Sequence, residues 1–122
     1  MSTEKAIRKL STHQQAVLIQ VLLTFPDEPV GVCYSPSVTD AQAYAEDFLT
    51  IFKAINWRVD HARAAADLTA ASGGLALVVA EGHLPPSAEA LRDALRIYGI
   101  EAEIEPDRAK LCGSNKFALV VT

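Results

Sequence analysis

The stretch from Val30 to Asp60 constrains the fold more than any other, because it has the pattern of a βαβ unit. Residues 30–34 form a short apolar run, and the turn-forming residues 35–37 end it. Apolar side chains then recur every three or four positions over 41–55, which predicts a helix. Residues 57–60 predict a second strand, so we expect two parallel strands joined by a helical crossover.

Both ends of the helix predicted over 41–55 carry recognisable signals. Thr39 and Gln42 have the spacing of a capping box, in which each residue bonds the backbone of the other. Asn56 suits the left-handed backbone conformation that often follows the last helical residue. The sequence therefore predicts where this helix starts and stops.

The chain before this unit predicts one more helix, over residues 11–25, after a flexible lead-in at 1–10. Two overlapping capping boxes precede its apolar run, Ser11 with Gln14 and Thr12 with Gln15. The run is apolar around most of the helix circumference, so this helix must be covered on more than one side. We expect burial against the sheet and a neighbouring helix, or a subunit interface that includes Val17, Val21 and Leu22.

After the first unit the chain predicts alternating helices and strands. The alanine-rich segment 61–71 favours a short second crossover helix. The strictly apolar run 75–80 predicts a central strand buried on both faces. Residues 86–98 predict a helix that Gly99 closes, and strands are expected at 101–105, near a sheet edge, and at 117–121.

These elements predict one α/β domain over residues 1–122 with three αβα layers. The sheet would be mostly parallel and five-stranded, in the flavodoxin-like order 2-1-3-4-5, with the N-terminal helix beside the 41–55 helix. The 86–98 helix would cover the opposite face. The last strand would run antiparallel to its predecessor, because the connection between them is short. A ferredoxin-like sheet is the main alternative, and the doubly buried run at 75–80 argues against it.

The expected core combines the apolar stripes of the helices with the inward positions of the strands. It comprises Val32, Tyr44, Phe48, Phe52, Leu77, Val79, Leu91, Leu95, Ile104 and Leu119.

Composition narrows the classes of function. The net charge of −4 and the lack of clustered cations argue against a nucleic-acid partner. Cys33 and Cys112 lack the spacing of a metal site and are expected to be free thiols. No signal peptide is visible, and the apolar run 16–25 is about half the length that a bilayer requires, so we expect no direct membrane insertion and a cytoplasmic location.

A ligand site is expected where the winding of an open α/β sheet reverses, between the loops after the first and third strands. Those loops offer hydroxyls and a helix N-terminus that favours an anion, and they predict binding by Tyr34, Ser35, Ser37, Thr39, Glu81 and His83. Capping alone also selects Ser, Pro and Thr at such a turn. Glu81 and His83 have the spacing of an acid and base pair or of two metal ligands, but that spacing is common by chance, so no metal or cofactor is assigned.

Two family resemblances carry further expectations. One pattern resembles an uncharacterised flavodoxin-like domain found in many bacterial proteins, often after a transmembrane or helical segment. It covers roughly residues 15–122 and implies an accessory or sensory role. It includes Asp40, Tyr44, Ala45, Phe48, Phe52, Trp57, Val59, Pro86, Ala88, Leu91, Ala94, Leu95, Gly99 and Ile100.

A second resemblance is to TIR domains, at their opening strand and helix. It rests on Val32-Cys33-Tyr34-Ser35 with Asp40, Ala45, Leu49 and Val59. This resemblance implies NAD cleavage by a glutamate, for which Glu89 after Ser87 is the positional match and Glu81 the other candidate.

No nucleotide-binding loop, nucleophile elbow or zinc-protease motif is present in the sequence. We therefore expect a non-catalytic ligand-sensing or protein-interaction module, as a homodimer or with a partner protein. It would be the cytosolic part of a larger bacterial signalling or membrane protein. The alternative is a TIR-like NAD-cleaving enzyme or a nucleotide-binding domain.

Overall fold

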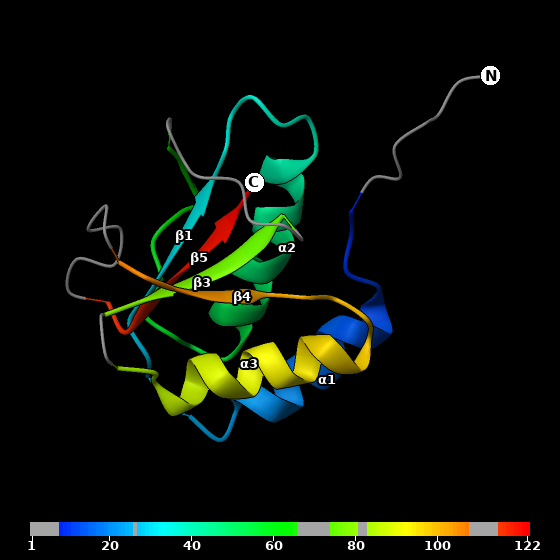
Figure 1. Cartoon of the computed structure of the whole chain (residues 1–122). Helices are drawn as coiled ribbons and strands as arrows, with labels where there is room; N and C mark the ends of the chain where they lie inside the picture. The colour runs from blue at the N-terminus through cyan, green and yellow to red at the C-terminus, as the bar shows by residue number, and fades with distance from the viewer. Residues whose placement is uncertain (1–7, 26, 66–73, 81–82, 108–114) are drawn as a thin grey trace.

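A computed structural model describes residues 8–25, 27–65, 74–80, 83–107 and 115–122 of the chain (Figure 1). Within these residues, helices and strands alternate along most of the chain, as the sequence predicts for an α/β domain. The elements are α1 (Thr12–Leu22), β1 (Val30–Tyr34), α2 (Ala41–Ala54), β2 (Arg63–Ala64), β3 (Leu75–Val79), α3 (Pro86–Ile97), β4 (Glu103–Pro106) and β5 (Phe117–Val121).

The helix ends follow their sequence signals at three of the four predicted places. Ser11 and Gln14 form the capping box of α1, with bonds of 3.1 and 2.9 Å between side chains and backbone. Asn56 and Gly99 adopt left-handed φ angles of 60° and 74° directly after α2 and α3. After α3, Ile100 N–H donates to the Leu95 carbonyl at 3.1 Å, which completes the expected C-terminal motif.

The predicted capping box of Thr39 and Gln42 is wrong. The residue that precedes α2 is Asp40, and its side chain makes no capping hydrogen bond. The Asp40 carboxylate instead binds Arg8, through the Arg8 backbone N–H at 3.0 Å and the guanidinium at 2.9 and 3.0 Å. A charged partner from a distant segment has displaced the local interaction that the spacing predicts.

The five strands form one mixed sheet in the order β2-β1-β5-β3-β4 (Figure 1). β1 pairs in parallel with β2 and β5, and β3 pairs in parallel with β4, whereas β3 and β5 are antiparallel. The predicted order 2-1-3-4-5 is therefore wrong. β5 lies between β1 and β3 instead of at the edge, and its antiparallel neighbour is β3.

The second strand of the first βαβ unit is shifted from its predicted position. Residues 57–60 contribute only one isolated bridge, between Pro29 and Arg58, and the strand proper is β2. Trp57, just before this bridge, has its side chain buried in the core. Its ring stacks on Phe52 at 5.2 Å, and its indole N–H donates to the Phe25 carbonyl at 2.6 Å. Of the crossover helix expected over 61–71, residues 61–65 form loop and β2, and the remainder lies outside the described residues.

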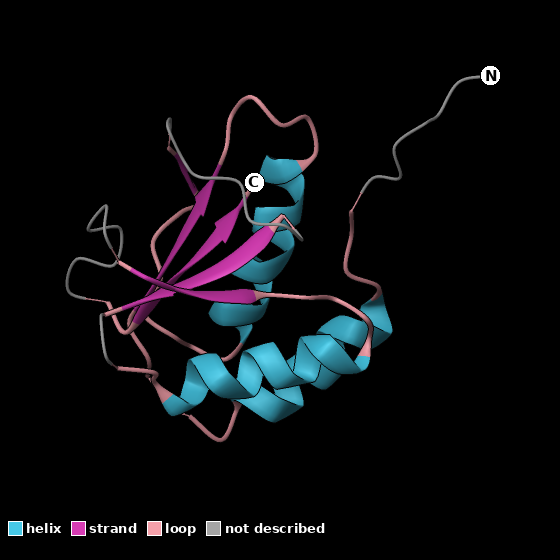
Figure 2. Ribbon diagram, in the orientation of Figure 1, coloured by secondary structure: helices cyan, strands magenta, loops and turns pink. Residues whose placement is uncertain are grey.

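All three described helices pack on the same face of the sheet (Figure 2). The expected placement of α3 on the opposite face, and with it the three-layer arrangement, is not found in the described part of the chain. The strand directions give the reason. The two βαβ units, β1-α2-β2 and β3-α3-β4, run in opposite directions on either side of β5. A half-turn about the sheet normal therefore relates the two units. Two right-handed crossovers related in this way place their helices on the same face of the sheet.

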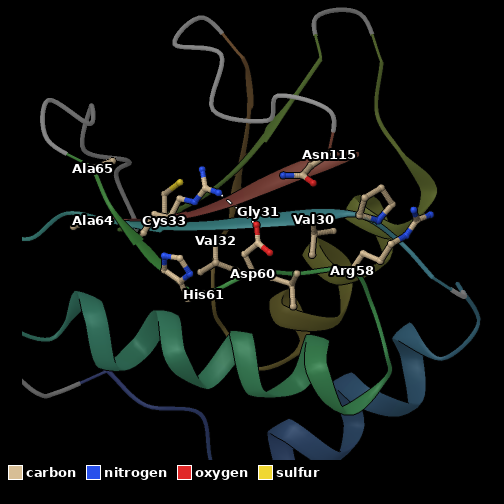
Figure 3. A pocket seen from close by; sticks show the side chains of 13 residues that line it. Val30, Gly31, Val32, Cys33, Arg58, Asp60, His61, Ala64, Ala65 and Asn115 are labelled. Atoms are coloured by element: carbon tan, nitrogen blue, oxygen red, sulfur yellow. Dashed lines mark hydrogen bonds and ion pairs between the residues drawn. The ribbon is translucent and has the colours of Figure 1, made fainter.

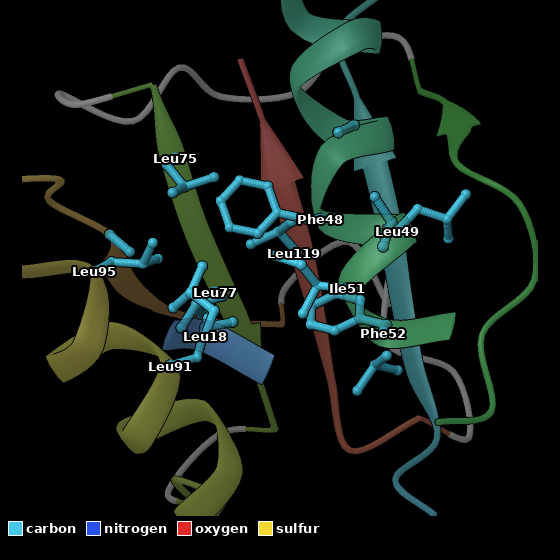
Figure 4. Packing of buried hydrophobic residues seen from close by; sticks show 14 of the residues in the cluster. Leu18, Phe48, Leu49, Ile51, Phe52, Leu75, Leu77, Leu91, Leu95 and Leu119 are labelled. Carbon is cyan, nitrogen blue, oxygen red and sulfur yellow. The ribbon is translucent and has the colours of Figure 1, made fainter. Parts of the chain in front are cut away.

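The core fills the space between this helical layer and the sheet (Figure 4). Nine of the ten predicted core residues are buried, and Ile104 is partly buried and packs against the others. β3 and β5 are buried at every position, which confirms that the run at 75–80 forms an interior strand. On the other sheet face a small separate cluster contains Cys33, Ala76, Val78, Ala118 and Val120.

Candidate functional site

A pocket lies along the edge of β1, where β1 faces residues 58–65. It has a volume of about 710 Å³, within the usual range for ligand sites. Five polar side chains line it, namely those of Arg58, Asp60, His61, Arg63 and Asn115. Figure 3 shows Cys33 and Asn115 on one side of the β1 ribbon and Asp60 and His61 on the other.

The pocket exists because the pairing of β1 with the following chain is interrupted. Pairing starts at the Pro29–Arg58 bridge and resumes at Cys33 with Arg63. Between these points three residues of β1, 30–32, face four residues, 59–62. The extra residue breaks the ladder, as in a β-bulge, and the chain leaves β1 before returning to it.

Among the described residues, the interruption leaves one backbone acceptor and one donor of β1 without partners. Val30 N–H donates to the Arg58 carbonyl at 3.0 Å, and the Tyr34 carbonyl accepts from Ala65 N–H at 2.9 Å. Alternate residues of a strand direct their N–H and C=O groups to the same neighbour, so the Val30 carbonyl and the Val32 N–H face the same edge. Neither group forms a hydrogen bond with a described residue. Unpaired backbone groups are costly where water is excluded, so a ligand or water must satisfy them in this pocket.

The charged groups around the pocket form weak surface pairs. Arg63 contacts Asp60 at 3.4 Å, with both side chains mainly exposed, and Arg58 contacts Asp27 at 3.1 Å. Exposed pairs of this kind contribute little free energy. A charged ligand can therefore replace either partner of such a pair at a small cost in free energy.

Cys33 is a buried free thiol on the pocket wall. Burial raises its pKa above the ordinary thiol value, and the charge of Asp107 acts in the same direction, whereas Arg63 opposes them. A thiol with a raised pKa stays protonated near neutral pH and is a poor nucleophile. Cys33 is therefore suited to line a binding site and not to attack a substrate.

The strongest described ion pair lies away from this pocket and joins the N-terminal segment to two elements. Arg8 binds the Asp40 carboxylate, donates to the Gly74 carbonyl at 3.0 Å, and lies 5.2 Å from the centre of the Tyr44 ring. Arg8 holds the pKa of Asp40 well below its usual range, chiefly through side-chain hydrogen bonds. Gly74 has a φ of 75°, which strains any residue with a side chain, and a Cβ there would also lie 3.0 Å from the Thr122 carbonyl oxygen, so glycine is favoured at this position.

The structure does not bring together the two loops that the sequence assigned to a ligand. Tyr34 ends β1, and the Ser35 and Ser37 hydroxyls lie 3.1 Å apart in the turn that follows, with Thr39 exposed before α2. Because β1 and β3 run in opposite directions, the loop after β3 lies at the other end of the sheet. His83 lines a separate hollow of about 310 Å³ with Glu105, and Glu81 lies outside the described residues. Binding by either loop stays a prediction.

The residues predicted for an interface on α1 differ in their exposure. Leu22 is fully buried in the core and is not available to a partner, whereas Val17 and Val21 are partly buried. Leu23, which the prediction did not assign to this interface, is 53% exposed at the end of α1. Self-association through Val17 and Val21 stays a prediction.

The described residues contain no group of three or more His, Cys, Asp or Glu side chains that could hold a metal ion. Glu89, the candidate for NAD cleavage, is exposed in the first turn of α3 and lines neither pocket. No described helix has both the length and the apolar character needed to cross a bilayer.

Fold and site together define an α/β domain with a mixed five-stranded sheet and a polar pocket at an interrupted strand pair. Comparison of the chain with protein-family models, curated proteins and solved structures found no match. Of the two resemblances noted in the sequence, only the α/β class is supported, and the predicted flavodoxin-like order 2-1-3-4-5 is not observed.

Sequence reasoning missed the residues that line this pocket. Arg58, Asp60, His61 and Arg63 lie in segments that were expected to be a regular strand and the start of a helix. Their spacing gave no motif, and the extra residue in 59–62 becomes visible only against β1. One signal was available: four polar, charged or titratable residues follow Trp57 within six positions, which is unusual for a strand that continues into a covered helix.

Proposed function

We propose that this domain is a non-catalytic ligand-binding module whose site is the pocket between β1 and residues 58–65. The observation that carries the proposal is the pair of unpartnered backbone groups, the Val30 carbonyl and the Val32 N–H, inside a pocket of about 710 Å³. Binding sites commonly combine apolar walls with a few convergent polar groups, and this pocket has both.

The chemistry of the lining supports binding over catalysis. The Cys33 thiol has a raised pKa, and the two arginines in the pocket already pair with carboxylates. An acid and base pair held by a third group, the arrangement that nucleophilic catalysis requires, does not occur among the residues that line this pocket.

A screen of small polar molecules against the purified domain tests the proposal, read out as the shift in thermal unfolding midpoint. Any molecule that binds only the folded state raises its free energy of unfolding, by about 2.7 kcal/mol at a concentration of 100 times Kd. Hits should also shift the backbone amide signals of residues 30–33 and 58–65 in NMR spectra.

Two matched variants locate the binding. Ala64 lines the pocket and is exposed, so Ala64→Trp should fill the space and abolish the shift produced by each hit. Ala43→Trp adds the same side chain at an exposed position of α2 outside the pocket lining, and should leave the shift unchanged. Hits that bind both variants equally would place the site elsewhere and contradict the proposal.

A further inference from the structure

We propose that the gap beside β1 binds the backbone of a single amino-acid residue, supplied by a free α-amino acid or by a short extended peptide. This inference rests on the proposed ligand-binding function and specifies the class of ligand. The unpaired groups, the charges on the pocket wall and the size of the pocket each support it.

The two unpaired groups of β1 occupy positions that a parallel ladder normally fills with one residue of the neighbouring strand. There, one residue of the neighbouring strand donates its N–H to one carbonyl and accepts, through its own C=O, the N–H found two residues later. On the β1 edge those two groups are the Val30 carbonyl and the Val32 N–H. If the pairing that starts at Pro29 and Arg58 continued, Asp60 would supply both bonds. It supplies neither.

The ligand that replaces these two missing hydrogen bonds must therefore carry an N–H group and a C=O group that are both bonded to one central carbon atom, the Cα. That arrangement defines an amino-acid residue in an extended conformation. A simple carboxylate satisfies only the Val32 N–H, and a simple amine satisfies only the Val30 carbonyl. A molecule with one of the two functions leaves one backbone group unpaired, which weakens its binding.

Asp60 and Arg63, which both line the pocket, supply one negative and one positive charge. Their carboxylate and guanidinium approach to 3.4 Å and are 78% and 65% exposed, so each can turn towards a ligand. The ammonium group of a free amino acid would pair with Asp60 and its carboxylate with Arg63. An internal peptide residue lacks both charges and would depend on the backbone groups alone.

The size of the pocket also fits a single residue with its side chain. A pocket of about 710 Å³ exceeds what one residue backbone requires, so space remains for its side chain or for flanking residues. The gap is closed at both ends by pairing, at Arg58 and at Arg63. A long strand cannot therefore add along β1, and the segment bound must be short.

NMR titration of the ¹⁵N-labelled domain tests this assignment. The probes are pooled free α-amino acids and, in a separate arm, N-acetyl amino acid N-methylamides. We expect the Val32 amide signal to shift downfield and its hydrogen exchange to slow by about tenfold in at least one arm. Whichever arm gives the response identifies the source of the residue.

A depsipeptide analogue, in which an ester oxygen replaces the donating N–H, is the matched control ligand. It keeps the shape of the N-methylamide but cannot donate to the Val30 carbonyl, so its binding should be at least about fivefold weaker. Equal binding of the two analogues would overturn the inference.

Two variants separate the charged contacts from the backbone contacts. Asp60→Ala and Arg63→Ala should each weaken the binding of free amino acids by about tenfold and leave the binding of the N-methylamides unchanged. Arg96→Ala removes an exposed arginine from the last turn of α3 and should affect neither arm. Free amino acids that bind the wild type and both pocket variants equally would contradict the assigned contacts.

The outcomes distinguish failure of this inference from failure of the proposed function. If a polar fragment shifts the signals of residues 58–65 but neither arm moves the Val32 amide, the pocket binds ligands of another class and this inference is wrong. If no molecule in the screen or in either arm moves any pocket signal, the ligand-binding function itself is wrong.

Discussion

The two βαβ units of this domain are built alike but differ in how their strands pair. In the second unit, β3 and β4 pair without interruption from Ala76 with Glu103 to Val79 with Pro106. In the first unit, β1 pairs with β2 at only two positions, beyond a gap that follows the Pro29–Arg58 bridge. The two units lie on either side of β5 (Figure 1). One motif therefore yields a closed ladder on one side of β5 and an open pocket on the other.

The segment that follows each helix accounts for the difference. After α3 the chain enters β4 through Ala102, a small buried residue that keeps the backbone on the path of a strand. After α2 the chain first buries Trp57 between Phe52 and Phe117 and then carries one residue more than β1 can pair. The extra residue after this buried anchor therefore leaves a pocket where the second unit has continuous pairing.

The largest expected effect comes from breaking the closed unit at Leu77, which is fully buried in β3. Leu77→Ala should lower the free energy of unfolding by about 2 to 5 kcal/mol, because it removes buried methyl groups and leaves a cavity. Urea unfolding at neutral pH measures this change.

A matched leucine provides the control for that measurement. Leu23 is 53% exposed, so Leu23→Ala should change the free energy of unfolding by less than about 0.5 kcal/mol. A loss below about 1 kcal/mol for Leu77→Ala would mean that β3 is not an interior strand.

The sequence predicts the ends of the helices in this fold better than it predicts the order of the strands. Local signals are reliable where a residue type controls its own backbone, as at Asn56 and Gly99, where the left-handed conformation was expected and is observed. Strand order is different, because it depends on contacts between distant segments. One clue was present: Phe117–Val121 is as uniformly apolar as β3, and a strand buried at all positions does not fit a sheet edge.

The candidate site was less predictable than the fold for a physical reason. The pocket arises from a mismatch in length between residues 30–32 and 59–62, and neither segment reveals that mismatch by itself. The predicted loops have good anion-binding chemistry, but their meeting required β1 and β3 to be parallel. β5 separates these strands and pairs antiparallel with β3.

An intermediate effect is expected from the contact that ties the two units together. Arg8 bridges Asp40, at the start of α2, and the Gly74 carbonyl, just before β3. Asp40→Asn should lower the free energy of unfolding by about 1 to 3 kcal/mol at pH 7, because a charged acceptor of several hydrogen bonds is lost. Chemical unfolding at a series of pH values measures it.

The pH dependence follows from the lowered pKa of folded Asp40. A group whose pKa is depressed by folding contributes stability above its unfolded pKa, about 3.9, and loses it as the pH falls towards the folded value. The difference between wild type and Asp40→Asn should therefore shrink below about pH 4. Asp27→Asn is the control, since Asp27 makes a surface pair with Arg58 and should cost under about 1 kcal/mol. A pH-independent difference for Asp40→Asn would contradict the assigned ionisation.

The smallest change that we expect is in the hydrogen exchange of single backbone amides, which compares the open edge of β1 directly with the paired edge of β3. Val32 N–H faces the gap and has no partner in the described part of the chain, whereas Val30 N–H, on the same edge of the same strand, donates to the Arg58 carbonyl. In the closed unit, Leu77 N–H occupies the matching position on the β3 edge that pairs with β4. A hydrogen bond contributes about 1 kcal/mol, so Val32 should exchange its amide hydrogen about five times faster than Leu77, after correction for intrinsic rates. Native-state exchange followed by NMR without ligand provides the measurement. Equal protection of Val32 and Leu77 from exchange would mean that the ladder beside β1 is closed in solution. The unpaired Val32 N–H that the pocket requires would then not exist.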